Sequence, residues 1–471
     1  MGETKQNQGL KAHLGIKTKS SSPCEVSRRI RKERYQLTRT ARAIYARQGE
    51  KEGLPYVLNY HRTAKCAYIA HDDVRVHVSC NHDKAFLSGV TACGSVWTCP
   101  VCGAKIEERR RSEIAKGVDY WYSLPNKTVN MITFTFSHSI GDRLADVLEK
   151  QRVALEKLRS GKAWSNFKDV FGFDSLIRSL EVTWSEENGW HPHTHELWCI
   201  DKCIDREKVE AYLKAKFKAK RHAARLSALL EMDSEAIFDA LLLERWEQCC
   251  ERAGLMVKAD GTPVSLDAFR KRSLDIKRHV SVGDYIAKQD DSRHWGVDRE
   301  MAKGSTKQGK KRGMHPFGFL SRFADSDSGN GEWAGRWLEY TKAIDGKRRL
   351  FWSHGLKNRA GIDELTDEEI AAKQDDEAVI VYEMMDLEWK KARHNVPKVL
   401  DAAEDSEDLK AVINNIEELD HFAEARQPST MEIFHASIRE AGRSPIIAAS
   451  TEVIDEIVNE FKAELLNRKR A

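Results

Sequence analysis

Apolar and β-branched residues gather in short runs in the middle of the chain, and these runs predict strands. The first is VNMITFTFS at 129–137, which contains β-branched and aromatic residues and no strand breaker. SLIRSLEVTWS at 175–185 and WHPHTHELWCI at 190–200 have the same character. SLDIKRH, Ser273–His279, predicts a fourth strand. The pattern therefore predicts a sheet whose strands are separated by other elements.

Helical spacing marks the segments between and after these strands. It extends from Asp205 to about Ala253, where Gly254 has the character of a C-cap. VGDYIAKQ at 282–289 predicts the start of another helix, and from about residue 360 the chain becomes acidic and helical. At the N-terminus a basic helix is expected from about Glu25, with little core potential.

Composition and charge limit the class of protein. Hydrophobic residues make up 41% and charged residues 32% of the 471, as in a globular protein of two or three domains. The net charge is only +4, so any basic surface is local. Lys214–Arg225 and Lys303–Gly313 are the candidates for such a surface. Because no long apolar run and no signal-peptide core is present, we expect a cytoplasmic protein without a membrane partner.

The two central strands predict a hairpin that brings a carboxylate to a row of histidines. A three-residue loop, 187–189, would place Gly189 in the left-handed region and Glu186 opposite Trp190. In that register Glu181 lies opposite His195 and shares its face. A two-residue turn would slip the register by one and send Glu181 to the other face.

The histidines themselves indicate a metal site. His191, His193 and His195 occupy alternate positions, so their side chains point to one face of a strand. Two imidazoles and one carboxylate on a sheet face can hold a divalent cation and leave positions open for a substrate. Surface histidines on a half-exposed strand are the alternative interpretation.

Two further groups of residues carry candidate chemistry. Tyr285 and Lys288 are three residues apart on the predicted helix and share a face, although core packing of the ring is an ordinary alternative. Cys93, Cys99 and Cys102 form a Cys-x-x-Cys pair with a third cysteine six residues earlier, a strong zinc pattern in a cytosolic protein. The fourth ligand stays open at this point, and three reduced core cysteines are the other interpretation.

In this order, these motifs resemble the rolling-circle replication initiators (Rep) of bacterial plasmids, which belong to the HUH endonuclease superfamily. The apolar strand MITFTFSH, the strand GWHPHTHELW and the helix GDYIAKQ match the family's three motifs. CGSVWTCPVCGAKI looks like its cysteine-rich segment, and Gly335–Ile362 looks like its C-terminal signature. The resemblance covers about residues 65 to 370.

The resemblance implies an α+β fold, with an antiparallel-sheet endonuclease domain and flanking helices. His193 and His195 would be metal ligands with Glu181 as the third, for Mg²⁺ or Mn²⁺. Tyr285 would be the nucleophile that nicks one DNA strand and keeps its 5′ end as a phosphotyrosine, and Lys288 matches the family's lysine.

Other positions are implied less directly by the family pattern. His191 would lie at the edge of the site or contact DNA. Cys66 matches the family position for the fourth ligand of a structural Zn²⁺, with Cys80 and His82 as alternatives. Origin DNA, single-stranded or extruded as a hairpin, would be the substrate, and a host helicase would be a partner.

Two positions depart from the family pattern. Thr194 stands between the two metal histidines, where a bulky apolar residue is usual. Some members place a glutamate one helical turn before the tyrosine, where this chain has Ser281. Asp284 is adjacent to the tyrosine but would point about 100° away on a helix.

The domain organisation that follows has four parts. They are a basic N-terminal extension (1–58), a small cysteine-rich zinc module (59–115), the endonuclease domain (116–325) and a mainly helical C-terminal region (326–471).

Three rival functions fit some of the same residues. A metal-dependent hydrolase with a His-x-His site would need further ligands from later in the chain, and would leave Tyr285 as packing. The available histidines are His279, His294 and His315. A non-catalytic DNA-binding protein built on the zinc module would leave the histidine strand unexplained. A related HUH transposase or relaxase is argued against by the cysteine segment and the C-terminal signature.

Overall fold

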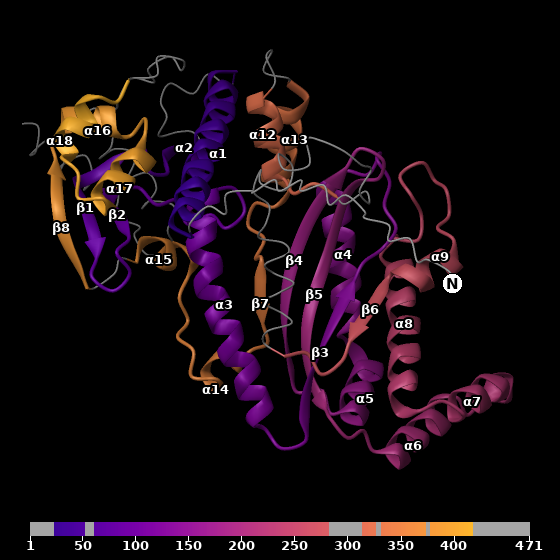
Figure 1. The fold of residues 1–471 in the computed structure, drawn as a ribbon. Helices are drawn as coiled ribbons and strands as arrows, with labels where there is room; N and C mark the ends of the chain where they lie inside the picture. The colour runs from indigo at the N-terminus through magenta and orange to yellow at the C-terminus, as the bar shows by residue number, and fades with distance from the viewer. Residues whose placement is uncertain (1–22, 52–60, 282–312, 326–330, 374–376, 418–471) are drawn as a thin grey trace, which may run out of the picture.

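The computed structural model describes residues 23–51, 61–281, 313–325, 331–373 and 377–417, which form two antiparallel sheets and their helices (Figure 1). The larger sheet has the strand order β6-β3-β5-β4-β7 and the smaller has β2-β1-β8. α1 and α3 lie between the two sheets in Figure 1. The predicted α+β class with antiparallel strands is confirmed.

All four predicted strands are present, and all four belong to the larger sheet. Its members are β3 Lys127–Phe134, β4 Ser175–Ser185, β5 Gly189–Asp201, β6 Leu274–Lys277 and β7 Leu350–Trp352. The smaller sheet is made of β1 Ala70–Ser79, β2 Ala85–Val90 and β8 Ala378–Met384. The sequence therefore located the larger sheet but not the smaller one.

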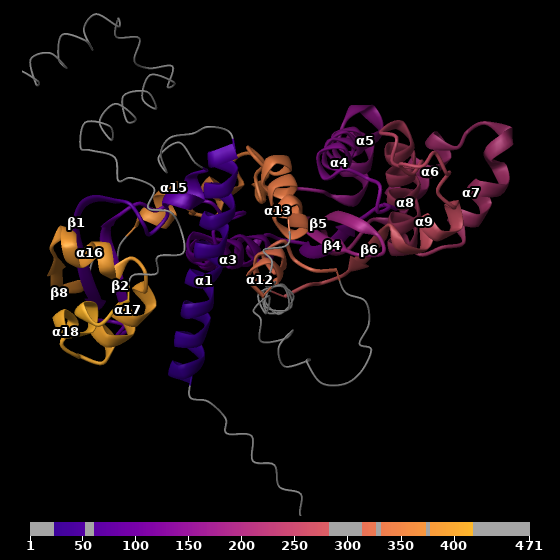
Figure 2. The same cartoon turned by 90° about the horizontal axis from the view of Figure 1, so that it is seen from above.

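The two faces of the larger sheet carry different layers of side chains. Trp198 of β5 points to one face, where its ring contacts those of Trp164 and Phe238 from α5 and α8. Leu197 and Cys199 point to the other face and pack against α3. The histidines of β5 share this second face, because they have the same parity as Leu197. Figure 2 shows α3 on the opposite side of the sheet from α4 and α5.

The predicted helical stretch after β5 is also confirmed. It contains α6, η2, α7 and α8, and Gly254 follows with a positive φ of 74°. Their bounds are Arg206–Lys216, Lys220–His222, Ala223–Leu230 and Ser234–Arg252. Before them come α1 Pro23–Lys51, α2 Arg62–Lys65, α3 Pro100–Ser123, α4 Leu144–Leu158 and α5 Gly161–Phe171.

The remaining helices surround the sheets. They are α9 Leu266–Arg272, α12 Phe317–Asp325, α13 Gly331–Ala343, α14 Leu356–Arg359, α15 Asp367–Ala372, α16 Asp386–Ala392, α17 Val396–Glu404 and α18 Leu409–Asn414. Among the helices of the described residues, none has the length and apolar character needed to cross a bilayer.

The expectation that the N-terminal helix has little core potential is wrong. α1 begins close to the predicted position, but its second half buries Ala41, Ile44 and Tyr45 in the main core. Tyr45 stacks on His61 with 4.4 Å between ring centroids. The many charges of this helix conceal a narrow apolar stripe, which is enough to bury one side of it.

The C-terminal region is less helical than predicted, since β7 and β8 both fall within it. β7 pairs with β4, and β8 pairs with β1, so each sheet includes residues from two distant parts of the chain. AVIVYEM, the sequence of β8, lies in acidic surroundings that hid its strand character. The four-part domain division stays a prediction, and both sheets cross its boundaries.

Candidate metal centres

The hairpin that carries the histidines turns one residue earlier than predicted. Ser185 pairs with Gly189, and Glu186–Asn188 form the loop. Gly189 has the expected positive φ, 70°, but it begins β5 instead of ending the loop. The predicted pairing of Glu181 with His195 is therefore wrong.

Glu181 lies opposite His193 instead. The register differs from the prediction by two residues, so Glu181 keeps its predicted face because side chains alternate with a period of two.

Glu181, His193 and His195 come together on this face, with their ligand atoms all within 4.8 Å of one another. Glu181 Oε2 lies 3.2 Å from His193 Nε2 and 3.4 Å from His195 Nε2. Bond lengths of about 2.0–2.2 Å to a central cation place neighbouring ligand atoms roughly 3 Å apart at right angles. The three side chains therefore fit one divalent cation and leave further positions of its coordination sphere to other ligands.

Hydrogen bonds on the far side of each imidazole aim its Nε2 at the carboxylate. His195 Nδ1 lies 2.9 Å from Thr133 Oγ1 on the neighbouring strand β3. His193 Nδ1 donates to the backbone carbonyl of His191 at 3.3 Å. A proton on Nδ1 leaves the Nε2 lone pair available to a metal. Sequence reasoning missed Thr133, and only the pairing of β3 with β5 identifies it.

The Glu181 carboxylate is held in its ionised form. Burial opposes ionisation, but the contacts with His193 and His195 outweigh it and lower the pKa of Glu181 well below its ordinary value. An ionised carboxylate is the form that binds a hard cation.

His191 lies beside this group and is not part of it. Its Nε2 is 2.6 Å from Thr135 Oγ1, and its ring stacks between those of His138 and His193, at 4.6 and 4.8 Å. Burial, together with the charges of His193 and His138, lowers the pKa of His191 to about 2. The imidazole is therefore neutral. His138, at the end of the first motif strand, was not singled out from the sequence.

A second group consists of four buried cysteines around the start of α3. The structure brings Cys66 to Cys93, Cys99 and Cys102, while Cys80 is exposed and outside the group. Neighbouring sulfur atoms are 3.4 to 3.8 Å apart. A tetrahedron with Zn–S bonds of about 2.3 Å has edges of about 3.8 Å, so the group could hold zinc. Cys102 N donates to Cys99 Sγ at 3.4 Å, as in a metal-binding knuckle. His82 is not part of this group either.

A cleft of about 510 Å³ connects the surroundings of the two groups. Ser179 and Glu181 line it from the sheet, and Trp97 lines it from the cysteine-rich segment. Arg348 and the partly exposed ring of Phe351 also face it. The cleft therefore offers a carboxylate, cations and aromatic rings in one place.

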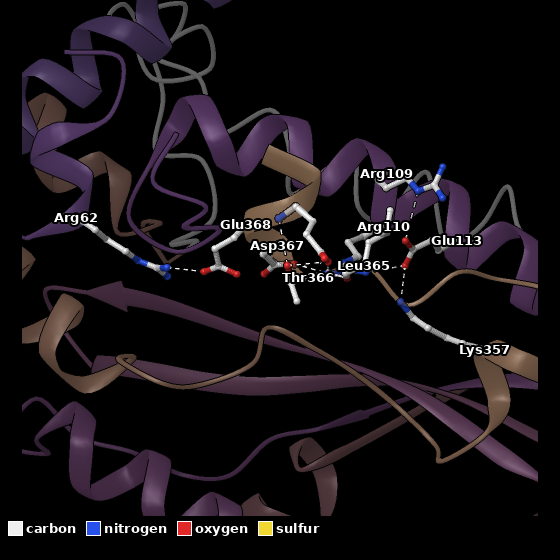
Figure 3. Close-up of polar contacts among 10 residues, drawn as sticks. Arg62, Arg109, Arg110, Glu113, Lys357, Leu365, Thr366, Asp367 and Glu368 are labelled. Atoms are coloured by element: carbon white, nitrogen blue, oxygen red, sulfur yellow. Dashed lines mark hydrogen bonds and ion pairs between the residues drawn. The ribbon is translucent and has the colours of Figure 1, made fainter. Parts of the chain in front are cut away.

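Ion pairs hold the wall of this cleft that lies along α3 (Figure 3). Arg62 bonds Glu368 at 2.6 Å, and Arg110 bonds Asp367 at 2.8 Å. Buried Glu113 accepts from Lys357 Nζ at 2.9 Å. These contacts attach α15 to α2 and α3, and α14 to α3.

The predicted nucleophile Tyr285 lies outside the described residues, as do Lys288 and Asp284. The basic stretch Lys303–Gly313 lies outside them except for its last residue. The stretch Lys214–Arg225 falls on α6, η2 and α7, where most of its side chains are exposed.

Val280 and Gly313 both lie on the histidine face of the larger sheet. Val280 N donates to Val129 O at 2.9 Å, and Val280 packs with Leu197 and α3. Met314 pairs with Trp184, and a Cβ on Gly313 would lie 2.8 Å from Thr183 Oγ1. Thr183 has the parity of Glu181, so Gly313 lies against the face that carries the metal group.

Comparison with known proteins gives a family match for part of the chain. Residues 84–218 match a family model described as a replication protein. A "Protein rep" from Streptomyces lividans is 26% identical over 313 residues, covering 58% of this chain and 65% of the relative. A "Neomycin resistance protein" from Streptomyces cyanogenus is 27% identical over 199 residues, covering 37% and 41%. This chain thus spans less than two thirds of either relative, and no solved structure matches it.

Proposed function

Because this chain belongs to the plasmid replication-protein (Rep) family, we propose that it nicks and rejoins one strand of origin DNA to initiate rolling-circle replication. The observation that carries the proposal is the group of Glu181, His193 and His195. It lies inside the segment 84–218 that matches the family, on one face of an antiparallel sheet.

In this proposal the three side chains hold Mg²⁺ or Mn²⁺. One carboxylate oxygen and two imidazole nitrogens suit a divalent first-row metal, and carboxylate also suits magnesium. When bound, such a cation supplies Lewis-acid polarisation of the scissile phosphate. The role of this chain's residues is to fix the site: Thr133 and the backbone of β5 orient the two imidazoles before any ligand arrives.

Tyr285 is the proposed nucleophile, and the position of Val280, five residues before it, supports this. Val280 is hydrogen-bonded to Val129 of β3, which lies opposite Cys199 of β5. Cys199 is four residues away from His195 on the same strand. Four residues of a strand span about 14 Å. Tyr285 is five residues beyond Val280, and five extended residues reach up to about 17 Å. This separation along the chain is compatible with the proposal that Tyr285 acts at the metal group.

The proposed step transfers one phosphoryl linkage. Tyr285 Oη forms a bond to the scissile phosphorus and loses its proton to solvent, while the bond from phosphorus to the 3′ oxygen breaks. The 3′ oxygen leaves as a free hydroxyl that primes synthesis. The phosphodiester is conserved as a phosphotyrosine, so a later attack by a 3′ hydroxyl rejoins the strand without ATP. Lys288 places a positive charge beside the same phosphate.

The cleft beside Glu181 is the proposed path of the single strand. The ring of Phe351 is 36% exposed and can stack with a base, and Arg348 is exposed and free to contact a phosphate. The cysteine group, with Zn²⁺, forms the opposite side of that path through Trp97. An extruded hairpin or single strand is needed, because a phenol must approach the phosphorus in line with the leaving oxygen.

The test is capture of a covalent adduct. Full-length protein is incubated with labelled single-stranded oligonucleotides of the parent origin and Mn²⁺, and a denaturation-resistant protein–DNA band is mapped by mass spectrometry. We expect the adduct on Tyr285, its loss in Tyr285→Phe, and its retention in Tyr382→Phe, which alters a tyrosine of the smaller sheet. Glu181→Gln is expected to lower the yield at limiting Mn²⁺.

A metal-dependent hydrolase gives the opposite pattern. It would cleave DNA without any adduct, and Tyr285→Phe would stay active while Glu181→Gln lost activity. Duplex binding with no cleavage under any divalent cation would instead identify a non-catalytic DNA-binding protein.

A further inference from the structure

A basic cavity lies between α1 and the start of α17, apart from both metal groups. It measures about 400 Å³. Five cationic side chains line it, three from α1 and two from the α16–α17 junction: Lys32, Arg39, Arg42, Arg393 and Lys398. Among the described lining residues Glu417 is the only carboxylate. The cavity therefore carries a local excess of positive charge that the net charge of the chain does not reveal.

Across the described part of the chain, none of these five cations takes part in an ion pair. Other arginines of α1 behave differently: Arg28 bonds Asp405 at 2.6 Å, and Arg31 bonds Asp401 at 2.9 Å. Those carboxylates belong to the C-terminal end of α17 and its cap. The C-terminal end of α17 thus neutralises positive charge on α1 with carboxylates. Its N-terminal end instead adds further positive charge beside α1.

Arg393 has two buried nitrogen atoms that an anion could satisfy. Its Nε and Nη1 have no hydrogen-bond partner among the described residues, although the side chain as a whole is half-buried. Its guanidinium lies over the ring of Tyr68, 4.5 Å from the centroid, and that of Arg42 lies over the same ring at 4.2 Å. Buried N–H groups without an acceptor are costly, and an anion in the cavity would remove that cost.

Arg42 is fixed in place by the chain around the cysteine group. Its Nε donates to Ala64 O at 2.7 Å and its Nη2 to Cys66 O at 2.9 Å. Burial lowers the pKa of Arg42 to about 10, and the charge of Arg39 acts in the same direction. These cations are therefore confined next to one another before any anion binds.

The start of α17 adds to the positive potential. Its N-cap residue, Asn395, makes no side-chain capping bond, and Pro397 stands in the first turn. Asn395 and Pro397 both line the cavity. The positive end of the helix dipole therefore faces the same space as the five cations.

We propose that this cavity binds phosphate groups of the DNA backbone and so holds duplex DNA on the side of α1 that faces α17. The inference rests on the proposed function, since it takes DNA as the ligand. A nucleic-acid backbone suits the cavity better than a free phosphate, because five cations exceed the charge of one phosphate dianion. Backbone contacts give affinity without reading sequence.

The test measures equilibrium binding of full-length protein to a fluorescein-labelled duplex by fluorescence anisotropy over a series of salt concentrations, without added Mg²⁺ or Mn²⁺. In Arg39→Gln/Arg393→Gln we expect Kd to rise at least tenfold. The slope of log Kd against log salt should fall by about two, because each phosphate contact contributes about 0.9. Arg152→Gln/Arg270→Gln is the matched control, since it removes two ion-paired arginines elsewhere, and its Kd should change less than twofold.

A second pair guards against a folding defect in the first. Lys32 and Lys398 are exposed, so Lys32→Gln/Lys398→Gln removes two charges without disturbing buried contacts. It should lower the salt slope in the same way. Wild-type Kd and slope in both double variants would overturn the proposal. So would loss of inorganic phosphate binding in the variants with DNA binding unchanged, because the cavity would then serve a small phosphate ligand.

Failure of this inference differs from failure of the proposed function. Binding is read without strand cleavage, so a protein that binds as expected but never forms the Tyr285 adduct sinks the nicking proposal alone. If the protein forms the adduct but both double variants bind duplex DNA normally, only the proposal for the basic cavity is wrong.

Discussion

At the scale of single residues, the metal group depends on atoms that are not ligands. Thr133 holds His195 by its Nδ1, and the backbone of β5 holds His193. Each contact fixes one imidazole ring about its side-chain torsions, so both Nε2 atoms face Glu181. Hydrogen bonds of this kind set both the tautomer of the imidazole and the direction of its lone pair.

Replacing Thr133 by valine tests this contact. Thr133→Val keeps the shape of the side chain but removes its hydroxyl, so the His195 ring is free to turn. We expect the affinity for Mn²⁺, measured by electron paramagnetic resonance titration, to fall about 10–100-fold. Thr128→Val is the control. Thr128 is on the same strand as Thr133, β3, and also bonds a histidine, His279, but it lies away from the metal group. Equal affinity in the two variants would show that Thr133 has no positioning role.

At the scale of elements, one glycine decides the geometry of the β4–β5 hairpin. Gly189 has a φ of 70°, and a Cβ there would lie 2.8 Å from Ile140 Cα. The hairpin in turn decides which residue of β4 lies opposite each histidine. The register of the metal group therefore originates at a turn several residues away from it.

Gly189→Ala is expected to destabilise the protein. The left-handed backbone alone costs a residue with a Cβ about 1–2 kcal/mol, and the clash with Ile140 adds to it. Chemical denaturation measures the change in the free energy of unfolding. Gly335→Ala is the opposite control: Gly335 is in α13 with open space around it, so alanine should stabilise by about 0.5–1 kcal/mol. An unchanged midpoint for Gly189→Ala would mean that the turn tolerates a different conformation.

At the scale of the whole molecule, the cysteine group brings together three segments of the chain. Cys66 follows α2, Cys93 follows β2, and Cys99 and Cys102 start α3. α1 packs over this region through Ala41 and the bonds of Arg42. The larger sheet, the cleft and the basic cavity all border on elements that the group holds together.

If the cysteine group binds zinc as proposed, Cys66→Ser is expected to release it and loosen this junction. A structural zinc site contributes directly to folding, so loss of one sulfur should lower the zinc content per chain and the Tm together. Atomic absorption and thermal unfolding measure the two quantities. Cys80→Ser is the control, since Cys80 is exposed and outside the group. Full zinc content in Cys66→Ser would require a different fourth ligand.

The sequence by itself determined the features that depend on neighbours along the chain. Strand periodicity placed the three histidines on one face, and the choice of a three-residue loop placed Glu181 on the same face. The register error of two residues left that face unchanged, because side chains alternate with a period of two. The Cys-x-x-Cys spacing likewise marked α3's first turn as a knuckle.

Only the tertiary structure decided the features that join distant segments. The pairing of β8 with β1, the approach of Cys66 to Cys93, the support of His195 by Thr133 and the meeting of Arg39 with Arg393 all depend on long-range contacts. Such contacts depend on how the faces of helices and sheets pack together. A local sequence pattern does not indicate which distant element will cover a given face. For this reason the basic cavity, made from two ends of the chain, had no counterpart in the sequence.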